Sequence, residues 1–225
     1  MNDVLTKHDM EIPRRPSELA VWFKAKYSEI RNNPEEVAKA RIRMGLYKHF
    51  IQEIYPLTIF TLWRFPQNDV LCKPVIGNQG HDAEIFINSD PKKVFSIEVT
   101  WPQDGRNHIE VAKIMNNHGV TSRVGDEFTE YNQNIFKRII GTAEKKAIRD
   151  YRTDFGSALL IVMSTECSPL DKIHRLVQID ALLDDIRKIS FKSNSVYLIT
   201  TPHEGVYTVF EQPTKGSSGR ATARR

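Results

Sequence analysis

The chain has 225 residues, of which 40% are hydrophobic, and a formal net charge of +4 at pH 7. It contains no run of eighteen apolar residues and no apolar signal segment, so the sequence favours neither a membrane protein nor a secreted one. Its only cysteines, Cys72 and Cys167, are far apart, which excludes a disulfide framework and a cysteine zinc site. We therefore expect a cytoplasmic protein whose residues 1–212 form one domain.

Two helices are predicted at the start of the chain, over residues 17–55. The first covers 17–32, where apolar residues recur at helical spacing. The second begins at Asn33-Pro34-Glu35-Glu36, which offers a capping side chain, a first-turn proline and two acids near the helix dipole. It should run past Ile54 and break or kink at Pro56. The sequence leaves residues 57–63 open between helix and extended chain.

Three short strands follow, at 75–77, 83–87 and 94–100. Turn-forming residues separate them at 77–80 and 88–91, which is typical of an antiparallel meander. Helical patterns are predicted over 108–117, 128–151 and 170–189, and the apolar run 158–163 is typical of a buried strand. A hairpin over 196–210 closes the domain. This order predicts an α/β fold with a mixed central sheet flanked by helices.

The last segment, residues 213–225, contains four basic residues and no acid. It holds the whole net positive charge, so residues 1–212 are neutral overall. Its glycine, serine and arginine content predicts a disordered basic tail. Net charge therefore says nothing about the partners of the folded domain.

Two acids stand out in the predicted hairpin of strands 83–87 and 94–100. Each strand alternates an apolar face with a polar face that carries acids. A turn centred on Asp90 pairs residue 84 with 96 and sets Asp82 opposite Glu98, with Cα atoms about 4.5–5.5 Å apart. Carboxylates this close repel each other unless a cation such as Mg²⁺ or Mn²⁺ lies between them. The alternative is that both acids simply face water.

Residues 44–199 resemble the PD-(D/E)XK nuclease superfamily. The resemblance lies in the order of the predicted elements, in Asp82 and in the tripeptide Glu98-Val99-Thr100. The resemblance implies a restriction-endonuclease-like core, Asp82 and Glu98 as ligands of Mg²⁺ or Mn²⁺, and hydrolysis of phosphodiester bonds in nucleic acid, DNA first and RNA second. The sequence departs from the family pattern at His81, which replaces a proline, and at Thr100, which replaces the lysine thought to position the attacking water. A relocated lysine or an inactive relative would both explain Thr100.

The family often adds a glutamate from its first core helix, and Glu53 is the candidate here as a third metal ligand. Gln79, just before the second strand, is a candidate contact to substrate or metal-bound water. Both have simpler alternatives, because a glutamate near a helix end is commonly solvated and Gln79 also suits a turn.

A replacement for the missing lysine is sought on the helix 128–151, whose second half is basic. Lys137 flanks the apolar stripe of this helix and is the first candidate for a catalytic role, with Lys146 on the other flank and Lys113 on the preceding helix as alternatives. The basic face of the helix also suits contacts to phosphates, although a solvated charged face has the same pattern.

Two non-catalytic functions remain open: a nuclease-fold module that binds nucleic acid or protein without cleaving, and a protein-interaction domain with surface acids. His108-Ile109-Glu110 has the spacing of a zinc deaminase motif, but the required cysteine pair is absent. No phosphate-binding P-loop, dinucleotide-binding motif or serine nucleophile elbow is present. The sequence therefore favours a metal-dependent nuclease over nucleotide-binding or serine-hydrolase functions.

Overall fold

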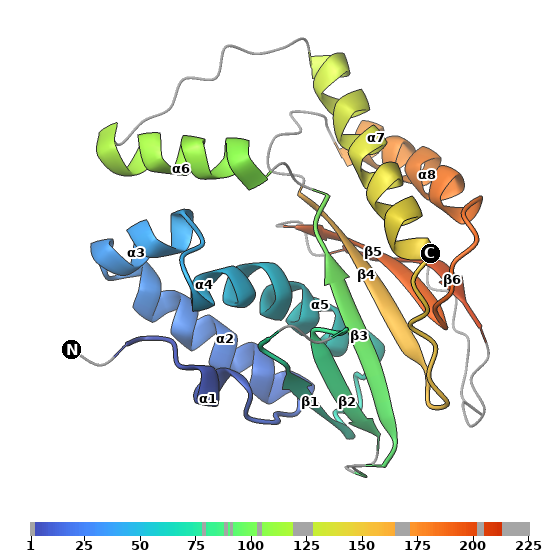
Figure 1. Cartoon of the computed structure of the whole chain (residues 1–225), viewed down its shortest axis with the longest axis horizontal. Helices are drawn as coiled ribbons and strands as arrows, with labels where there is room; N and C mark the ends of the chain where they lie inside the picture. Colours follow the sequence, from blue (N-terminus) through green and yellow to red (C-terminus); the bar gives the residue numbers. More distant parts are fainter. Residues whose placement is uncertain are drawn as a thin grey trace.

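The computed structural model describes residues 3–77, 80–87, 90, 92–102, 105–118, 128–164, 172–201 and 205–212. Within these residues, helices flank both faces of a six-stranded mixed sheet (Figure 1). The predicted α/β class is therefore confirmed. In the described part of the chain, no helix is long and apolar enough to cross a membrane. The predicted tail, 213–225, lies outside the described residues.

The strands lie across the sheet in chain order, from β1 to β6. The first half is an antiparallel meander of β1 (Val70–Pro74), β2 (Ala83–Ile87) and β3 (Val94–Thr100). This meander was predicted, with β2 and β3 at the expected residues. The first strand was placed wrongly at 75–77, because the pattern did not show that Pro74 can end a strand where its missing N–H is not needed.

The second half of the sheet consists of β4 (Ser157–Ser164), β5 (Ser195–Thr201) and β6 (Gly205–Glu211). β4 runs parallel to β3 and β5 runs parallel to β4, whereas β6 returns antiparallel to β5. The buried strand and the closing hairpin are thus confirmed. The carboxyl ends of three parallel strands meet at one edge of the sheet, which is where open α/β sheets commonly bind ligands.

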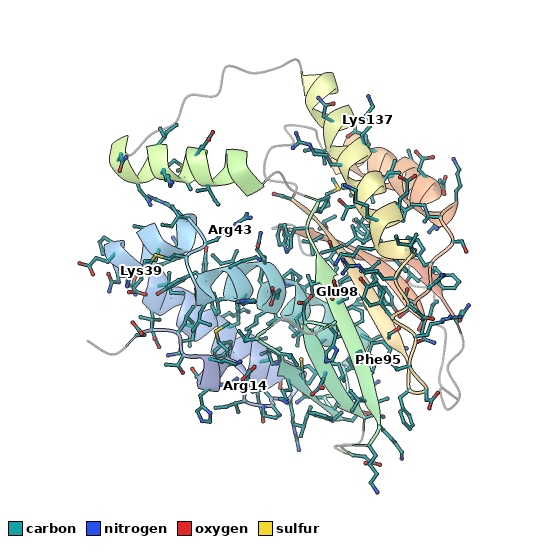
Figure 2. All side chains as sticks on the ribbon, viewed as in Figure 1. Arg14, Lys39, Arg43, Phe95, Glu98 and Lys137 are labelled. Atoms are coloured by element: carbon teal, nitrogen blue, oxygen red, sulfur yellow. The ribbon has the colours of Figure 1, made fainter. Side chains whose placement is uncertain are left out.

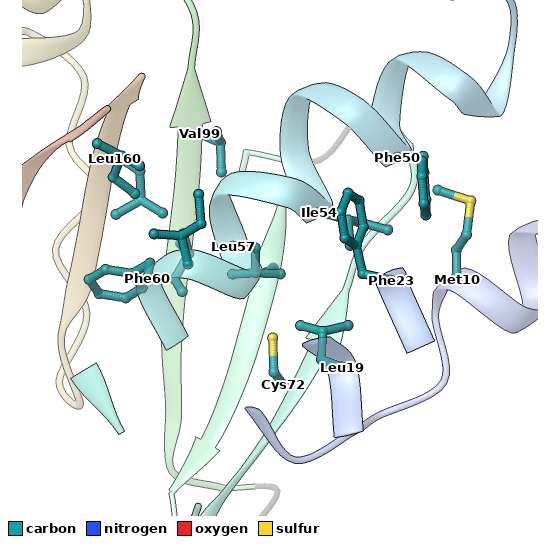
Figure 3. Packing of buried hydrophobic residues seen from close by; sticks show 14 of the residues in the cluster. Met10, Leu19, Phe23, Phe50, Ile54, Leu57, Phe60, Cys72, Val99 and Leu160 are labelled. Atoms are coloured by element: carbon teal, nitrogen blue, oxygen red, sulfur yellow. The ribbon is translucent and has the colours of Figure 1, made fainter. Parts of the chain in front are cut away.

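Both faces of the sheet are covered, by different helices. On one face, α2 (Pro16–Arg31) and α5 (Tyr55–Arg64) pack over a core that includes Ile97 and Leu160 (Figure 3). On the other, α7 (Phe128–Ala147) and α8 (Lys172–Arg187) pack over Leu159, Ile161 and Leu198. Burial on both faces explains why β4 is a continuous apolar run rather than an alternating one.

The N-terminal region contains more helices than predicted. A short α1 (Lys7–Met10) precedes α2, and α3 (Pro34–Arg41) begins as expected, with Asn33 Oδ1 accepting a hydrogen bond from the N–H of Glu35 at 3.0 Å. The helix expected to continue to Ile54 instead ends at Arg41. The chain turns there through Arg43 and Gly45, whose φ angles of 55° and 56° are left-handed and incompatible with an α-helix.

After this turn the chain is helical from Leu46 to Arg64. It passes through α4 (Leu46–His49), a π-helix η1 (Phe50–Ile54) and α5. Pro56 lies in the first turn of α5, so the proline marks a change of helix type rather than an end. The segment 57–63, which the sequence left open, is helical.

Among the described residues between β3 and β4, two segments are helical. The first, α6 (Gly105–His118), packs beside α3, where Asn116 Nδ2 donates to the carbonyl of Ala38 at 3.1 Å. The second, α7, ends at Ala147, four residues before the predicted boundary at 151. Helices were predicted at all three positions that α6, α7 and α8 occupy, so the element order of this half is confirmed.

Gly205, at the start of β6, leaves no room for a side chain. An added Cβ would lie 2.7 Å from Thr200 Oγ1 and 2.9 Å from Tyr207 Cε2. We expect Gly205→Ala to lower the free energy of unfolding by about 1–3 kcal/mol, measured by urea denaturation. Gly141→Ala on α7 is the control, since its Cβ would meet nothing within 4 Å and alanine is the better helix former. Equal stability of Gly205→Ala and the wild type would contradict this packing.

Candidate active site

Glu98 and Thr100 lie on the face of β3 that α7 covers. Their neighbours Ile97 and Val99 join the core of the opposite face, so the predicted alternation is confirmed. Glu98 is only 9% exposed and forms an ion pair with Lys146 Nζ of α7. The alternative that this acid simply faces water is therefore wrong for Glu98. Thr100, also buried, stands where the family resemblance expects lysine, and Lys146 brings a positive charge to the same face.

Asp82 lies one residue before β2, beside Glu98. The observed register pairs Glu84 with Ser96 and Ala83 with Ile97, as predicted, and one further step sets Asp82 opposite Glu98. Its backbone N–H donates to the carbonyl of Ile97 at 2.7 Å, and its Oδ2 accepts from the backbone N–H of Val99 at 2.7 Å. These two bonds fix the side chain against β3.

The electrostatic environment of Asp82 is unusual for a surface hairpin. Burial, followed by the negative charges of Glu53 and Glu98, raises the pKa of Asp82 from 3.8 to about 7. The hydrogen bond from Val99 and the charge of Lys146 act the other way but do not compensate. Asp82 therefore holds a proton at near-neutral pH when no other cation is present.

Glu53 enters the same cluster from the π-helix η1. Its Oε2 lies 2.7 Å from His49 Nδ1, one turn earlier, and both side chains are partly buried. The hydrogen bond to Glu53 is the main cause that raises the pKa of His49, and the charge of Asp82 contributes. The electrostatic coupling of Glu53 to Asp82 places the predicted third acid in the neighbourhood of the other two.

A hydrogen bond next to a proline holds η1 against the end of β3. Pro56 has no N–H, so the carbonyl of Gln52, four residues earlier, cannot receive the usual helical hydrogen bond. The indole Nε1 of Trp101, the first residue after β3, donates to this carbonyl instead. The residue next to Gln52 is Glu53, so this bond fixes the acid-bearing helix relative to the strand that carries Glu98.

The lysine candidates occupy different places. Lys146, an alternative in the sequence analysis, contacts Glu98. Lys137 is exposed nine residues earlier on α7, about 14 Å along the helix axis, and Figure 2 shows it near the end of α7 farther from Glu98. Lys113 is exposed on α6. The catalytic role of Lys137 stays a prediction, and Gln79 lies outside the described residues.

Sequence reasoning missed His49 and Trp101. The four-residue spacing of His49 and Glu53 was a usable signal, because residues four apart lie on the same face of a helix. The contact of Trp101 with Gln52 had no signal in the pattern, since it depends on how η1 crosses the end of β3. Each of these residues positions an acid-bearing element rather than adding another carboxylate.

The acid cluster suits a hard divalent cation. Burial is the main cause of the raised pKa of Asp82, and the negative charges of Glu53 and Glu98 add to it, so a cation bound here would relieve their repulsion. In the described part of the chain, the hydrogen bonds of these acids use Glu53 Oε2, Asp82 Oδ2 and Glu98 Oε1, and the other oxygen of each carboxylate can bind a cation. Among the described residues, no three His, Cys, Asp or Glu side chains form a complete ligand set by themselves. Mg²⁺ does not require one, since it binds through one or two carboxylates, waters and substrate phosphate.

The likeness to the PD-(D/E)XK superfamily rests on Asp82, Glu98 and the order of the elements around them. In this order, a helix precedes the meander, further helices follow it and a buried parallel strand comes next. None of the protein-family models, curated proteins or solved structures compared with this chain matches it.

Proposed function

We propose that this chain is a metal-dependent nuclease with a restriction-endonuclease-like core, which hydrolyses phosphodiester bonds of DNA or RNA. One observation carries the proposal. Asp82 and Glu98 lie opposite each other in one hairpin, and burial together with the negative charges of Glu53 and Glu98 raises the pKa of Asp82 to about 7. A purely structural role would not require three carboxylates close together in a partly buried site, whereas a metal site does.

Each residue of the cluster has a role in this mechanism. Asp82 and Glu98 would hold Mg²⁺ or Mn²⁺, which would supply charge neutralisation of the phosphate and a water of lowered pKa, and Glu53, the predicted third ligand, would add negative charge beside them. The N–H of Val99 keeps Asp82 turned toward the cluster, and His49 does the same for Glu53. Lys146 supplies the positive charge that Thr100 lacks, next to Glu98.

A second function, a nuclease-fold module that binds without cleaving, is favoured by a specific observation. Each acid already has a protein partner: His49 for Glu53, the Val99 N–H for Asp82 and Lys146 for Glu98. In such a module the ion pair of Glu98 with Lys146 would be permanent. Binding of a divalent cation separates the two functions. Only in the enzyme must Glu98 bind a metal ion, either after Lys146 moves away or together with Lys146.

The test is a cleavage assay on purified protein with labelled DNA and RNA, in Mg²⁺, in Mn²⁺ and in EDTA. We expect cleavage with either metal, none in EDTA, and a loss below detection in Glu98→Gln. The matched control is Glu84→Gln, on the same face of the hairpin but paired with Lys73 at 3.5 Å, which should leave cleavage unchanged. Equal cleavage by Glu98→Gln, or no cleavage of any substrate by the wild type, would reject the enzyme.

A further inference from the structure

The described surface contains a pocket of about 620 Å³ between the end of β3 and one face of α7. Trp101 and Pro102 form its strand side. Its helix side is a stripe at helical spacing, whose members include Asn134, Lys137, Arg138, Gly141 and Lys145. No part of the proposed mechanism uses this pocket.

The lining of the pocket is suited to an anion. Lys137, Arg138 and Lys145 contribute three positive charges, and none of the described residues that line the pocket is acidic. A concave wall that carries one sign of charge concentrates ligands of the opposite sign. Asn134 adds an amide that can donate hydrogen bonds to phosphate or to a base edge.

Trp101 is the aromatic residue among the described residues that line the pocket. Its ring is half-buried, and the hydrogen bond from its Nε1 to the carbonyl of Gln52 fixes its orientation. Opposite, Gly141 brings no side chain, and an added Cβ there would meet nothing within 4 Å, so the helix side of the pocket is open. Cations that follow a backbone together with an aromatic ring that stacks on a base are the combination used to bind single-stranded nucleic acid.

The pocket lies next to the acid cluster along two elements. Trp101 directly follows Thr100 on the strand that carries Glu98, and Lys145 directly precedes Lys146, the partner of Glu98. A strand held in the pocket is therefore led toward the acids. A duplex keeps its bases paired and stacked, and so cannot offer one to the ring of Trp101 without being opened.

We propose that this pocket binds a short single-stranded segment of nucleic acid, with phosphates on Lys137, Arg138 and Lys145 and a base on Trp101. The inference rests on the proposed function for what happens to the strand afterwards. Binding itself needs no cleavage, so it is tested in EDTA. This keeps a failure of the pocket distinct from a failure of the nuclease.

The experiment measures fluorescence anisotropy of a labelled single-stranded oligonucleotide and of the matching duplex. Gly141→Glu places a carboxylate in the pocket, and Gly141→Gln places a neutral group of the same shape there; both replace a helical glycine at an open position. We expect Gly141→Glu to bind the single strand at least about tenfold more weakly than Gly141→Gln, with the difference shrinking as salt rises.

Substitutions at two lining positions, Lys137 and Trp101, test the parts of the pocket. Lys137→Gln should weaken binding and lower the slope of log affinity against log salt concentration by about 0.7, the value for one lost phosphate contact on a single strand. The control is Lys188→Gln on α8, which is paired with Asp185 and does not line the pocket, and which should change neither quantity. Trp101→Leu should weaken binding about tenfold and Trp101→Phe should retain most of it, because phenylalanine keeps a ring.

Three results would overturn the proposal that this pocket binds a single strand. These are equal affinities of Gly141→Glu and Gly141→Gln, equal binding of duplex and single strand, or a Lys137→Gln protein that binds as the wild type does. If Lys137→Gln lowers kcat and leaves binding unchanged, Lys137 belongs to the catalytic mechanism instead.

Discussion

Replacement of Lys146 by methionine is expected to lower the free energy of unfolding by about 3–5 kcal/mol at pH 8, measured by urea denaturation in EDTA. Methionine keeps most of the length of the side chain but removes its charge. The side chain of Glu98 is only 10% exposed, so it would be left as a buried carboxylate with Asp82 beside it and no cation. The loss of the partner, rather than the loss of packing, is the cause of the effect.

The neighbouring residue provides the control. Lys145 is exposed and Lys145→Met should change the free energy of unfolding by less than about 0.5 kcal/mol. The loss of unfolding free energy caused by Lys146→Met should also be smaller in a Glu98→Gln background, since glutamine carries no charge that needs a partner. Wild-type stability of Lys146→Met at pH 8 would show that Glu98 is not held by this lysine.

Asp82→Asn is expected to act on stability and on cleavage in opposite directions. The pKa of about 7 lies above the ordinary value of 3.8, so the folded state holds a proton that the unfolded state releases. Stability is therefore lost as pH rises from about 4 to about 7, and the separation corresponds to roughly 4 kcal/mol at about 1.4 kcal/mol per pH unit. Asparagine has no charge to lose, and its amide oxygen can still accept from the Val99 N–H.

The measurement is the free energy of unfolding in EDTA between pH 4 and pH 8. Asp82→Asn should be more stable than the wild type at pH 8, and the two should converge toward pH 4. The same variant should lose metal-dependent cleavage, because an amide cannot replace a carboxylate ligand of Mg²⁺ at similar affinity. A pH profile identical to that of the wild type would mean that Asp82 does not carry the raised pKa.

The parts of the fold that depend on local patterns were predictable from sequence. The strict alternation of 83–87 and 94–100 gave two strands and their register, and the uninterrupted apolar run 158–163 gave the buried one. The end of α3 was not predictable in the same way, because residues 34–54 have helix-forming composition throughout and nothing but Gly45 indicates a turn. The left-handed φ of Arg43 has no signal in its residue type.

In the candidate site, too, local contacts were predictable from the sequence and contacts between distant elements were not. Asp82 and Glu98 are brought together by a hairpin register, which is a local property of the sequence. The contact between Glu98 and Lys146 joins residues 48 positions apart. A helical wheel placed both Lys137 and Lys146 on flanks of the apolar stripe, but the choice between them depends on how α7 crosses β3, which periodicity does not describe.

The π-helix η1 adds one residue to the chain without turning the helices on either side of it. A π turn contains one residue more than the α turn it replaces, so deletion of a single residue within 50–54 would restore a regular helix from α4 into α5 without breaking it. The faces of the flanking helices would keep their orientation, because four α-helical residues complete about the same rotation as the five residues of the π turn. Loss of Ile51 or Gln52 would bring His49 and Glu53 from four residues apart to three, a spacing that still places both on one face of the helix. During evolution, a one-codon change here is thus a route by which a lineage alters the spacing of His49 and Glu53 while its fold persists.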